Sequence, residues 1–138
     1  MTDAFRLDER LRADTVEVDS WDLSLVLLMN DANYPWLVLV PRRPGLRDFH
    51  DLVPPDLLRL TAEIVRASNL LISLFPAERK PDKMNVAALG NQVPQLHVHV
   101  IARFTDDPAW PRPVWGVVPA RPYDDRALAE RLRRLRGR

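Results

Sequence analysis

Residues 92–103 of this 138-residue chain read QVPQLHVHVIAR and hold two of its three histidines. Apolar and polar residues alternate here as in a β-strand, whose successive side chains point to opposite faces. One face would carry Gln95, His97 and His99. The other would carry only apolar residues: Leu96, Val98, Val100 and Ala102. Alternate residues of a strand lie roughly 6.5–7 Å apart, so the two imidazoles can flank one tetrahedral group, such as a phosphoryl group.

Two antiparallel hairpins are predicted around this strand. Residues 23–29 and 36–40 are apolar, and residues 30–35 between them have a turn-rich composition. Residues 84–88 precede the histidine strand and are separated from it by a turn at 89–94, which gives the second hairpin. The strands therefore predict an antiparallel sheet.

Three helices are predicted. The longest begins at residues 54–56, where two prolines and an aspartate suit a first helical turn, and it ends before Pro76. Its apolar residues recur at helical spacing: Leu57, Leu60, Ile64, Ala67, Leu71 and Leu74. A final helix begins at one of the aspartates at 124–125, and a short helix spans residues 3–12 with Asp3 as its N-cap.

The order of these elements predicts an α+β fold. We expect an antiparallel sheet of about five strands, with one long helix on one face and a C-terminal helix. The length favours a single domain over residues 1–138, with its core at about 5–116 and a C-terminal arm and helix at 117–138. The face of the sheet opposite the long helix is left for a ligand.

Composition narrows the class of protein. Hydrophobic residues make up 46% and charged residues 28%, and no apolar run reaches the ~18–20 residues of a membrane span. The charged N-terminus predicts no secretory signal, and the absence of cysteine is compatible with a cytoplasmic location. A net charge of +1 predicts neither a nucleic-acid nor a membrane partner.

The arginines have two expected roles. Arg42 and Arg103 are expected in surface ion pairs. The arginines of residues 126–138 are expected either to form a solvated helix face or to steer phosphate.

His97 is the candidate nucleophile. Imidazole is readily neutral and nucleophilic at pH 7, and one ring nitrogen can attack while a backbone carbonyl fixes the other. His99 would then hydrogen-bond a phosphate oxygen or deliver a proton to the leaving group. The competing interpretation is that both are satisfied core histidines, but two on one strand face beside a polar turn favour chemistry.

The turn before the histidine strand could hold an anion. Gly90 lets backbone amides approach closely, while Asn91 and Gln92 offer side-chain donors. Asn85, on the neighbouring strand, could face the same site. The same residues also make a good hairpin turn without any ligand.

A metal site is the main competing use of a His-x-His strand, because zinc accepts neutral imidazole. The remaining ligands would be His50 or a carboxylate, since cysteine is absent. Neither the strand nor its turn contains Asp or Glu. We therefore expect no metal and no cofactor.

Residues 95–101, QLHVHVI, resemble the signature of the histidine triad (HIT) superfamily, His-φ-His-φ-His-φ-φ with φ apolar. Gln95 stands where the first histidine of the triad should be. Residues 37–43, LVLVPRR, look like the family's apolar strand that closes in proline and basic residues. Residues 110–116, WPRPVWG, are similar to the segment after the triad in the Hint branch. The resemblance covers roughly residues 5–116.

This resemblance implies a HIT-like hydrolase that cleaves at an α-phosphate through a covalent nucleotidyl-histidine. His97 would be the nucleophile, and His99 would contact the phosphate and the leaving group. The expected nucleotide- and phosphate-binding residues are Asn85, Gly90, Asn91, Gln92 and Gln95, with Asp31 at the ribose. The resemblance also implies a homodimer, with Trp110 and Trp115 at its interface or near the site.

The expected function is a hydrolase or nucleotidyltransferase acting on nucleoside 5′-phosphate derivatives. Its substrates would be dinucleoside polyphosphates such as diadenosine tetraphosphate, adenylate esters or phosphoramidates. The alternative is a noncatalytic nucleotide-binding or sensing module that uses the same pocket, with Gln95 and the arginine-rich tail serving partner contacts.

Overall fold

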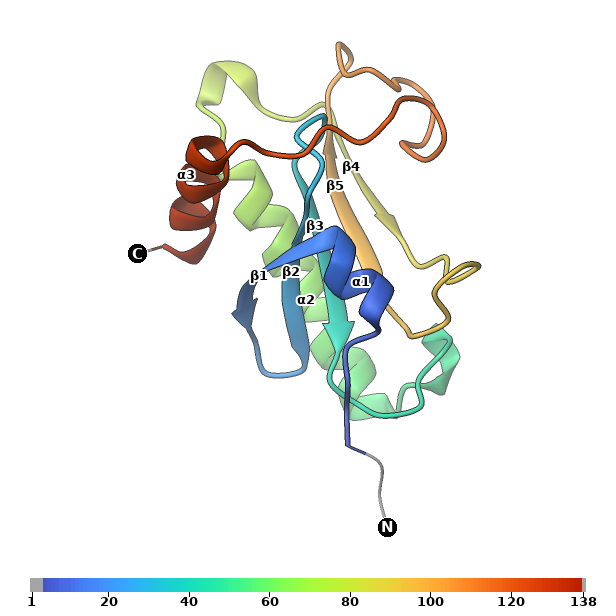
Figure 1. Ribbon diagram of the computed structural model, residues 1–138. Coiled ribbons are helices and arrows are strands. Elements are labelled where there is room, and N and C mark those ends of the chain that lie inside the picture. Colours follow the sequence, from blue (N-terminus) through green and yellow to red (C-terminus); the bar gives the residue numbers. More distant parts are fainter. Residues whose placement is uncertain (1–3, 138) are drawn as a thin grey trace.

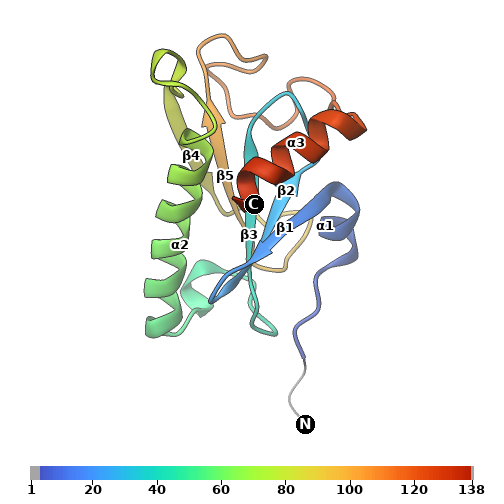
Figure 2. The same cartoon turned by 90° about the vertical axis from the view of Figure 1, so that its left-hand side faces the viewer.

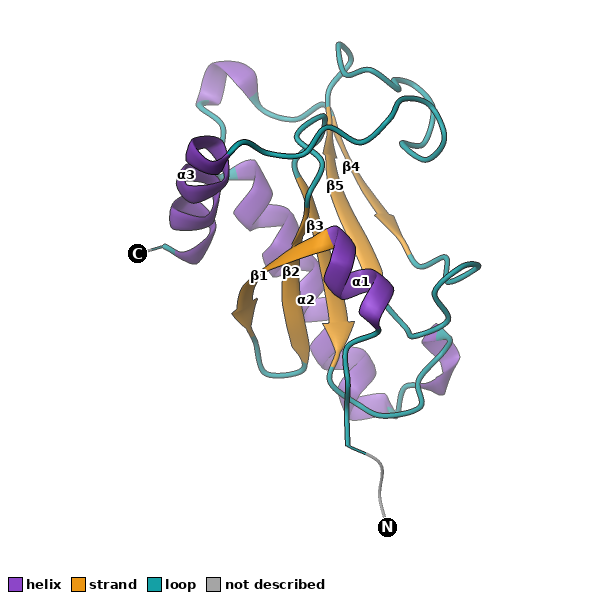
Figure 3. Ribbon diagram, viewed as in Figure 1, coloured by secondary structure: helices purple, strands orange, loops and turns teal. Residues whose placement is uncertain are grey.

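The computed structural model describes residues 4–137, and a five-stranded antiparallel sheet organises them (Figures 1 and 3). The strands are β1 (Thr15–Ser20), β2 (Ser24–Met29), β3 (Trp36–Pro41), β4 (Lys83–Ala87) and β5 (Val98–Arg103). Their order across the sheet is β1-β2-β3-β5-β4, so the two predicted hairpins meet where β3 pairs with β5. The predicted α+β fold class and both hairpins are confirmed.

Strand β1 was not among the predicted elements. It alternates two valines with acidic residues and is short, so its period-2 signal is weaker than that of its neighbours. It pairs with β2 across a register shift between Glu17 and Asp19. Strand β5 begins at Val98 instead of residue 95, so Gln95 and His97 lie on the segment that leads into the strand.

The helices are α1 (Glu9–Asp14), α2 (Pro54–Ile72) and α3 (Asp125–Arg136), with short 3-10 turns at Phe49–Asp51 and Ala77–Arg79. The predicted helix over 3–12 is wrong in its bounds, because α1 begins at Glu9 and the side chain of Asp8 accepts the N–H of Arg10 as its N-cap. Asp3 lies outside the described residues. Asp124 caps α3 by accepting the N–H of Ala127, as one of the two predicted alternatives requires.

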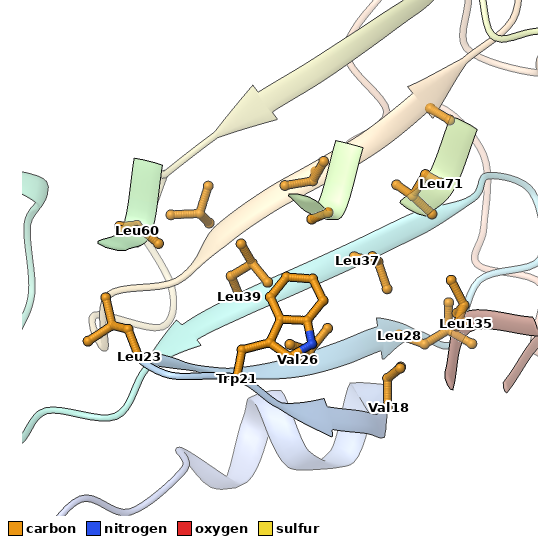
Figure 4. Packing of buried hydrophobic residues seen from close by; sticks show 14 of the residues in the cluster. Val18, Trp21, Leu23, Val26, Leu28, Leu37, Leu39, Leu60, Leu71 and Leu135 are labelled. Carbon is orange, nitrogen blue, oxygen red and sulfur yellow. The ribbon is translucent and has the colours of Figure 1, made fainter. Parts of the chain in front are cut away.

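One face of the sheet packs under α2 and α3. Here lie the apolar residues of β5 that the alternation predicts, together with Leu37 and Leu39 of β3 (Figure 4). The predicted stripe of α2 joins them through Leu60, Ala67 and Leu71, which are fully buried. This core fixes which way β5 faces, because a register slip by one residue would turn the whole strand over.

The opposite face carries a second, smaller core and is only partly open. Figure 2 shows α1 and α2 on opposite sides of the sheet. The N-terminal segment covers this face with Leu7 and Leu11, and the chain after β5 covers it with Ala109 and Val114. The expectation of a free face is therefore corrected: two segments wall it in and leave a cleft between them.

Both arginines expected in surface ion pairs behave differently. Arg103 is only 1% exposed, and its guanidinium makes a bidentate ion pair with Asp107, with nitrogen–oxygen distances of 2.7 and 3.0 Å. Arg42 is half-buried and donates to the carbonyl oxygens of Trp21 and Asp22. Asp107 lies only four residues after Arg103, but sequence spacing does not show that this pair is buried, and the partners of Arg42 are 20 and 21 residues away in the chain.

Within residues 4–137, no helix has the length and apolar character needed to cross a membrane.

Candidate active site

A cleft of about 630 Å³ contains both histidines of the strand. Four parts of the chain form its walls: the end of α1, the β2–β3 turn, the turn before β5 and the C-terminal arm. The lining residues include Leu11, Asp14, Asn30, Asp31, Trp36, Gly90, Asn91, Gln92, His97, His99, Trp115, Ala120 and Pro122.

The backbone fixes the ring of His97. Its Nδ1 lies 2.7 Å from the carbonyl oxygen of Gln95. A carbonyl oxygen only accepts hydrogen bonds, so Nδ1 carries the proton and Nε2 keeps a lone pair. The residue is 6% exposed, so water competes little for that lone pair. One ring nitrogen of His97 is therefore fixed by a backbone carbonyl oxygen, and the other is left for a ligand.

His99 has the opposite hydrogen-bond arrangement. Its Nδ1 lies 3.0 Å from Nε1 of Trp36, which can only donate. Burial, and to a smaller extent the nearby His97, together lower the pKa of His99 to about 4. The two imidazole rings lie 4.9 Å apart, centre to centre. The low pKa favours a neutral His99 ring at pH 7, and the indole N–H faces its Nδ1 as a donor.

The turn at residues 89–93 lies beside the two histidines, as expected. Gly90 has a φ of +75°, a conformation that L-residues with side chains rarely adopt, and an added Cβ would lie 3.4 Å from the carbonyl oxygen of Val93. Asn91 and Gln92 line the cleft and are exposed. Arg10 secures the turn by donating from Nη1 to the carbonyl oxygen of Gln92 at 2.8 Å.

Gln95 does not line this cleft. Its Nε2 donates to the carbonyl oxygen of Arg6 at 2.7 Å, and its Oε1 accepts the N–H of Asp8 at 2.9 Å. The side chain thus ties the N-terminal segment to the histidine strand. It also borders a second cavity, of about 210 Å³, that is lined by His50 and His97 among others.

Asn85 does not line the main cleft either. It faces the same side of the sheet as His99, but its Oδ1 accepts from Nη1 of Arg103 at 2.8 Å. Arg103 in turn holds Asp107. Asn85 therefore belongs to the buried polar cluster Asn85–Arg103–Asp107, which supports the segment after β5.

Asp31 lines the far wall of the cleft. Its Oδ1 accepts the N–H groups of Asn33 at 3.0 Å and Arg121 at 3.2 Å. Among the hydrogen bonds of residues 4–137, none uses Oδ2. The contact with Arg121 also attaches the C-terminal arm, so Asp31 orders the wall that Ala120 and Pro122 complete.

Two tryptophans complete the surroundings of His99. Trp115 packs edge-on against His99, with ring centres 5.0 Å apart, and against Trp36 at 5.8 Å. The family resemblance points to Trp115, whereas the sequence pattern predicts Trp36 only as part of an apolar strand. Its place could be found only by knowing that β3 pairs with β5, which puts Trp36 opposite Ile101 and Val38 opposite His99. The two strands are far apart in the sequence.

The alternative of a metal site at His97 and His99 would need further ligands close to these two residues. In residues 4–137, no three His, Cys, Asp or Glu side chains form a group that could hold a metal ion. His50 is exposed and lies 3.8 Å from a carboxylate oxygen of Asp51.

A prediction follows from the placement of Gln95. We expect Gln95→Ala to loosen the N-terminal wall of the cleft, because it removes two hydrogen bonds worth roughly 0.5–1.5 kcal/mol each. Amide hydrogen exchange would then be faster at Asp8 and across α1 than in the wild-type protein. Gln92→Ala is the matched control, since only the backbone carbonyl of Gln92 holds Arg10. Unchanged protection of α1 in Gln95→Ala would contradict this role.

Comparison with known proteins identifies the family. The HIT domain family model matches residues 10–106. The chain therefore belongs to the HIT domain family. A search of curated proteins finds no significant match.

Solved structures of histidine triad proteins resemble the chain closely. The protein of Bradyrhizobium japonicum is 47% identical, with a TM-score of 0.91 and 98% of each chain covered. The protein of Marinobacter aquaeolei VT8 is 46% identical, with a TM-score of 0.92 over 98% of this chain and 96% of that one. The protein of Sinorhizobium meliloti 1021 is 40% identical, with a TM-score of 0.88 over 95% and 94%.

Proposed function

We propose that the protein is a nucleotide-binding hydrolase or nucleotidyltransferase that cleaves nucleoside 5′-phosphate derivatives at the α-phosphate. The observation that carries this proposal is His97, a buried imidazole whose Nδ1 is engaged by a backbone carbonyl and whose Nε2 keeps its lone pair. Membership of the HIT domain family supports it. The substrates we infer are dinucleoside polyphosphates such as diadenosine tetraphosphate, adenylate esters and phosphoramidates.

The reaction proceeds in two displacements. Nε2 of His97 forms a bond to the α-phosphorus while the bond from phosphorus to the leaving group breaks. Water then attacks the nucleotidyl-histidine, which releases a nucleoside monophosphate and restores His97. The chain needs no cofactor for either step.

The turn beside the histidines binds the phosphate. Backbone N–H groups at Gly90 and the side chains of Asn91 and Gln92 supply donors to the equatorial oxygens, where negative charge accumulates. Asp31 binds the ribose hydroxyls through Oδ2. Asn85, which the sequence analysis placed among the phosphate contacts, acts instead through Arg103 on the cleft wall.

Gln95 occupies the position of the first histidine of the triad and has a supporting role. Its backbone carbonyl fixes the tautomer of His97, and its side-chain amide holds residues 6 and 8. The amide reaches the N-terminal segment and not the phosphate. Attack by His97 therefore does not depend on a third imidazole.

The experiment that tests the function separates catalysis from binding. The protein is incubated with diadenosine tetraphosphate and, separately, with adenosine 5′-phosphoramidate, and AMP release is followed by chromatography. Calorimetric titration with AMP measures binding in parallel. Release of AMP supports the enzyme, whereas AMP binding without product from either substrate supports the alternative, a noncatalytic nucleotide-binding module.

We also propose that the protein is a homodimer that pairs through β4. This strand is an open edge of the sheet, and Val86 on it is 48% exposed. On α2, Leu58 and Val65 are likewise exposed, at 73% and 56%. Unpaired strand edges and exposed apolar residues commonly form the interface of a homodimer.

The oligomeric state gives a direct prediction. Light scattering after size-exclusion chromatography should give the mass of two chains for the wild-type protein and of one chain for Val86→Lys. Val118→Lys, at an exposed valine of the C-terminal arm, should leave the mass unchanged. A wild-type protein with the mass of one chain would contradict pairing through β4.

A further inference from the structure

Trp36 makes a hydrogen bond that involves neither His97 nor the turn at residues 89–93, which is called the phosphate turn below. It lies at the first position of β3, and its indole Nε1 donates to Nδ1 of His99 at 3.0 Å. Trp36 and His99 are each 5% exposed. Burial removes water as a competitor for this bond, so the indole is the partner that Nδ1 depends on.

We propose that Trp36 is a positioning residue that fixes the tautomer of His99, so that Nε2 carries the proton and serves as a hydrogen-bond donor in the cleft. This inference rests on the proposed function, because it assigns the form in which His99 meets the phosphate or the leaving group. It concerns a residue outside the histidine strand, contributed by the first hairpin.

The argument depends on what each group can do. An indole N–H is a donor only, so the nitrogen facing it must be an acceptor. If Nδ1 of His99 carried a proton, two N–H groups would face each other in a buried site, which is strongly unfavourable. The Nδ1-protonated tautomer and the imidazolium form are both disfavoured for this one reason.

The neighbours of His99 offer no competing way to set its protonation. Val38 of β3 and Ala87 of β4, which pair with His99 across the sheet, are apolar, and Trp115 packs against it with its ring edge. Among these contacts His97 is the one titratable group. The low pKa of His99, about 4, is consistent with a ring that stays neutral.

The two histidines thereby receive opposite tautomers from two different elements. A backbone carbonyl places the proton of His97 on Nδ1, and the indole of Trp36 places the proton of His99 on Nε2. One ring then offers a lone pair and the other an N–H, which are the two complementary groups that an attack on an anionic phosphate needs.

The test is a two-bond ¹H–¹⁵N correlation spectrum of the ligand-free protein labelled at histidine. Wild-type protein is expected to show His99 as a single Nε2–H tautomer with Nδ1 as an acceptor. Trp36→Phe keeps an aromatic ring but removes the donor, so a measurable Nδ1–H population should appear and the Nδ1 resonance should shift. Site-specific replacement of Trp36 by benzothienylalanine, which keeps the shape of the indole without its N–H, should give the same change.

Trp115→Phe is the control, because it removes an indole that also contacts His99 without any hydrogen bond to it; the wild-type tautomer should persist. An unchanged His99 tautomer in both Trp36 variants would overturn the proposal, as would a wild-type His99 protonated on Nδ1. The spectrum needs no substrate. A wild-type protein with the expected tautomer but no AMP release would therefore reject the proposed function and leave the tautomer assignment standing.

The kinetic consequence is a split between the two steady-state constants. Loss of one transition-state hydrogen bond predicts about a tenfold lower kcat in the benzothienylalanine variant, with KM within about twofold. A raised KM with kcat unchanged would mean that Trp36 only shapes the cleft.

Discussion

His97→Ala is expected to abolish turnover while nucleotide binding is retained. Removal of a nucleophile leaves no atom to form the covalent intermediate, and such losses lower kcat by roughly 10⁴-fold or more. The phosphate turn and Asp31 belong to other segments and stay in place, so the dissociation constant for AMP should change by less than about tenfold. Steady-state AMP release and calorimetric titration measure the two quantities.

His50→Ala is the matched control for this experiment. His50 is the third histidine and is exposed, and it lines the smaller cavity and not the main cleft. Its loss should change kcat by less than about twofold. Substantial turnover in His97→Ala would contradict the covalent route, and a comparable loss in His50→Ala would move the chemistry to the smaller cavity.

Asp107→Ala is expected to destabilise the protein by about 3–5 kcal/mol, the cost of removing one partner of a buried ion pair. The Asp107 side chain is 5% exposed and that of Arg103 2%. Burial alone would raise the pKa of Asp107, but hydrogen bonds from Arg103 and from the N–H groups of Phe104, Trp110 and Ala109 outweigh it and lower that pKa. The substitution leaves the guanidinium hydrogen-bonded to Asn85 and removes the carboxylate acceptor of the N–H groups of Phe104 and Ala109, while the N–H of Trp110 keeps the backbone carbonyl oxygen of residue 107.

Urea unfolding monitored by tryptophan fluorescence measures this loss. Asp106→Ala is the control, because Asp106 is an exposed neighbour whose ion pair with Arg79 lies at the surface. Such pairs contribute about 0–1 kcal/mol, so its free energy of unfolding should change little. Equal losses in both variants would contradict the structural role assigned to the buried cluster.

Local patterns in the sequence are enough to predict most of the fold. The alternation at 96–102 assigns the core face of β5, and the helical spacing at Leu60, Ala67 and Leu71 assigns the buried face of α2. Both signals arise from residues that are neighbours along the chain, so they survive without knowledge of the tertiary structure. Two local features are not predicted by these patterns: the strand β1, whose alternation is weak, and the start of α1, which lies later in the chain than expected.

The candidate site is predicted only in part. His97, His99 and the turn at 90–92 are close in sequence, and the cleft brings them together. Gln95 and Asn85 were expected at the phosphate but do not line the cleft, because Gln95 binds the N-terminal segment and Asn85 binds Arg103, which was expected at the surface. The register of β3 against β5 places Trp36 beside His99, and sequence spacing alone does not give that register.

The most direct test of the account is intact-protein mass spectrometry after rapid mixing with an adenylate donor and quenching under conditions that preserve a phosphorus–nitrogen bond. Wild-type protein is expected to gain the mass of one adenylyl group transiently, and peptide mapping should place it on His97. His97→Ala should gain none. Product formation by the wild-type protein with no adduct on His97 at any time point, or an equal adduct in His97→Ala, would contradict nucleophilic catalysis by this histidine.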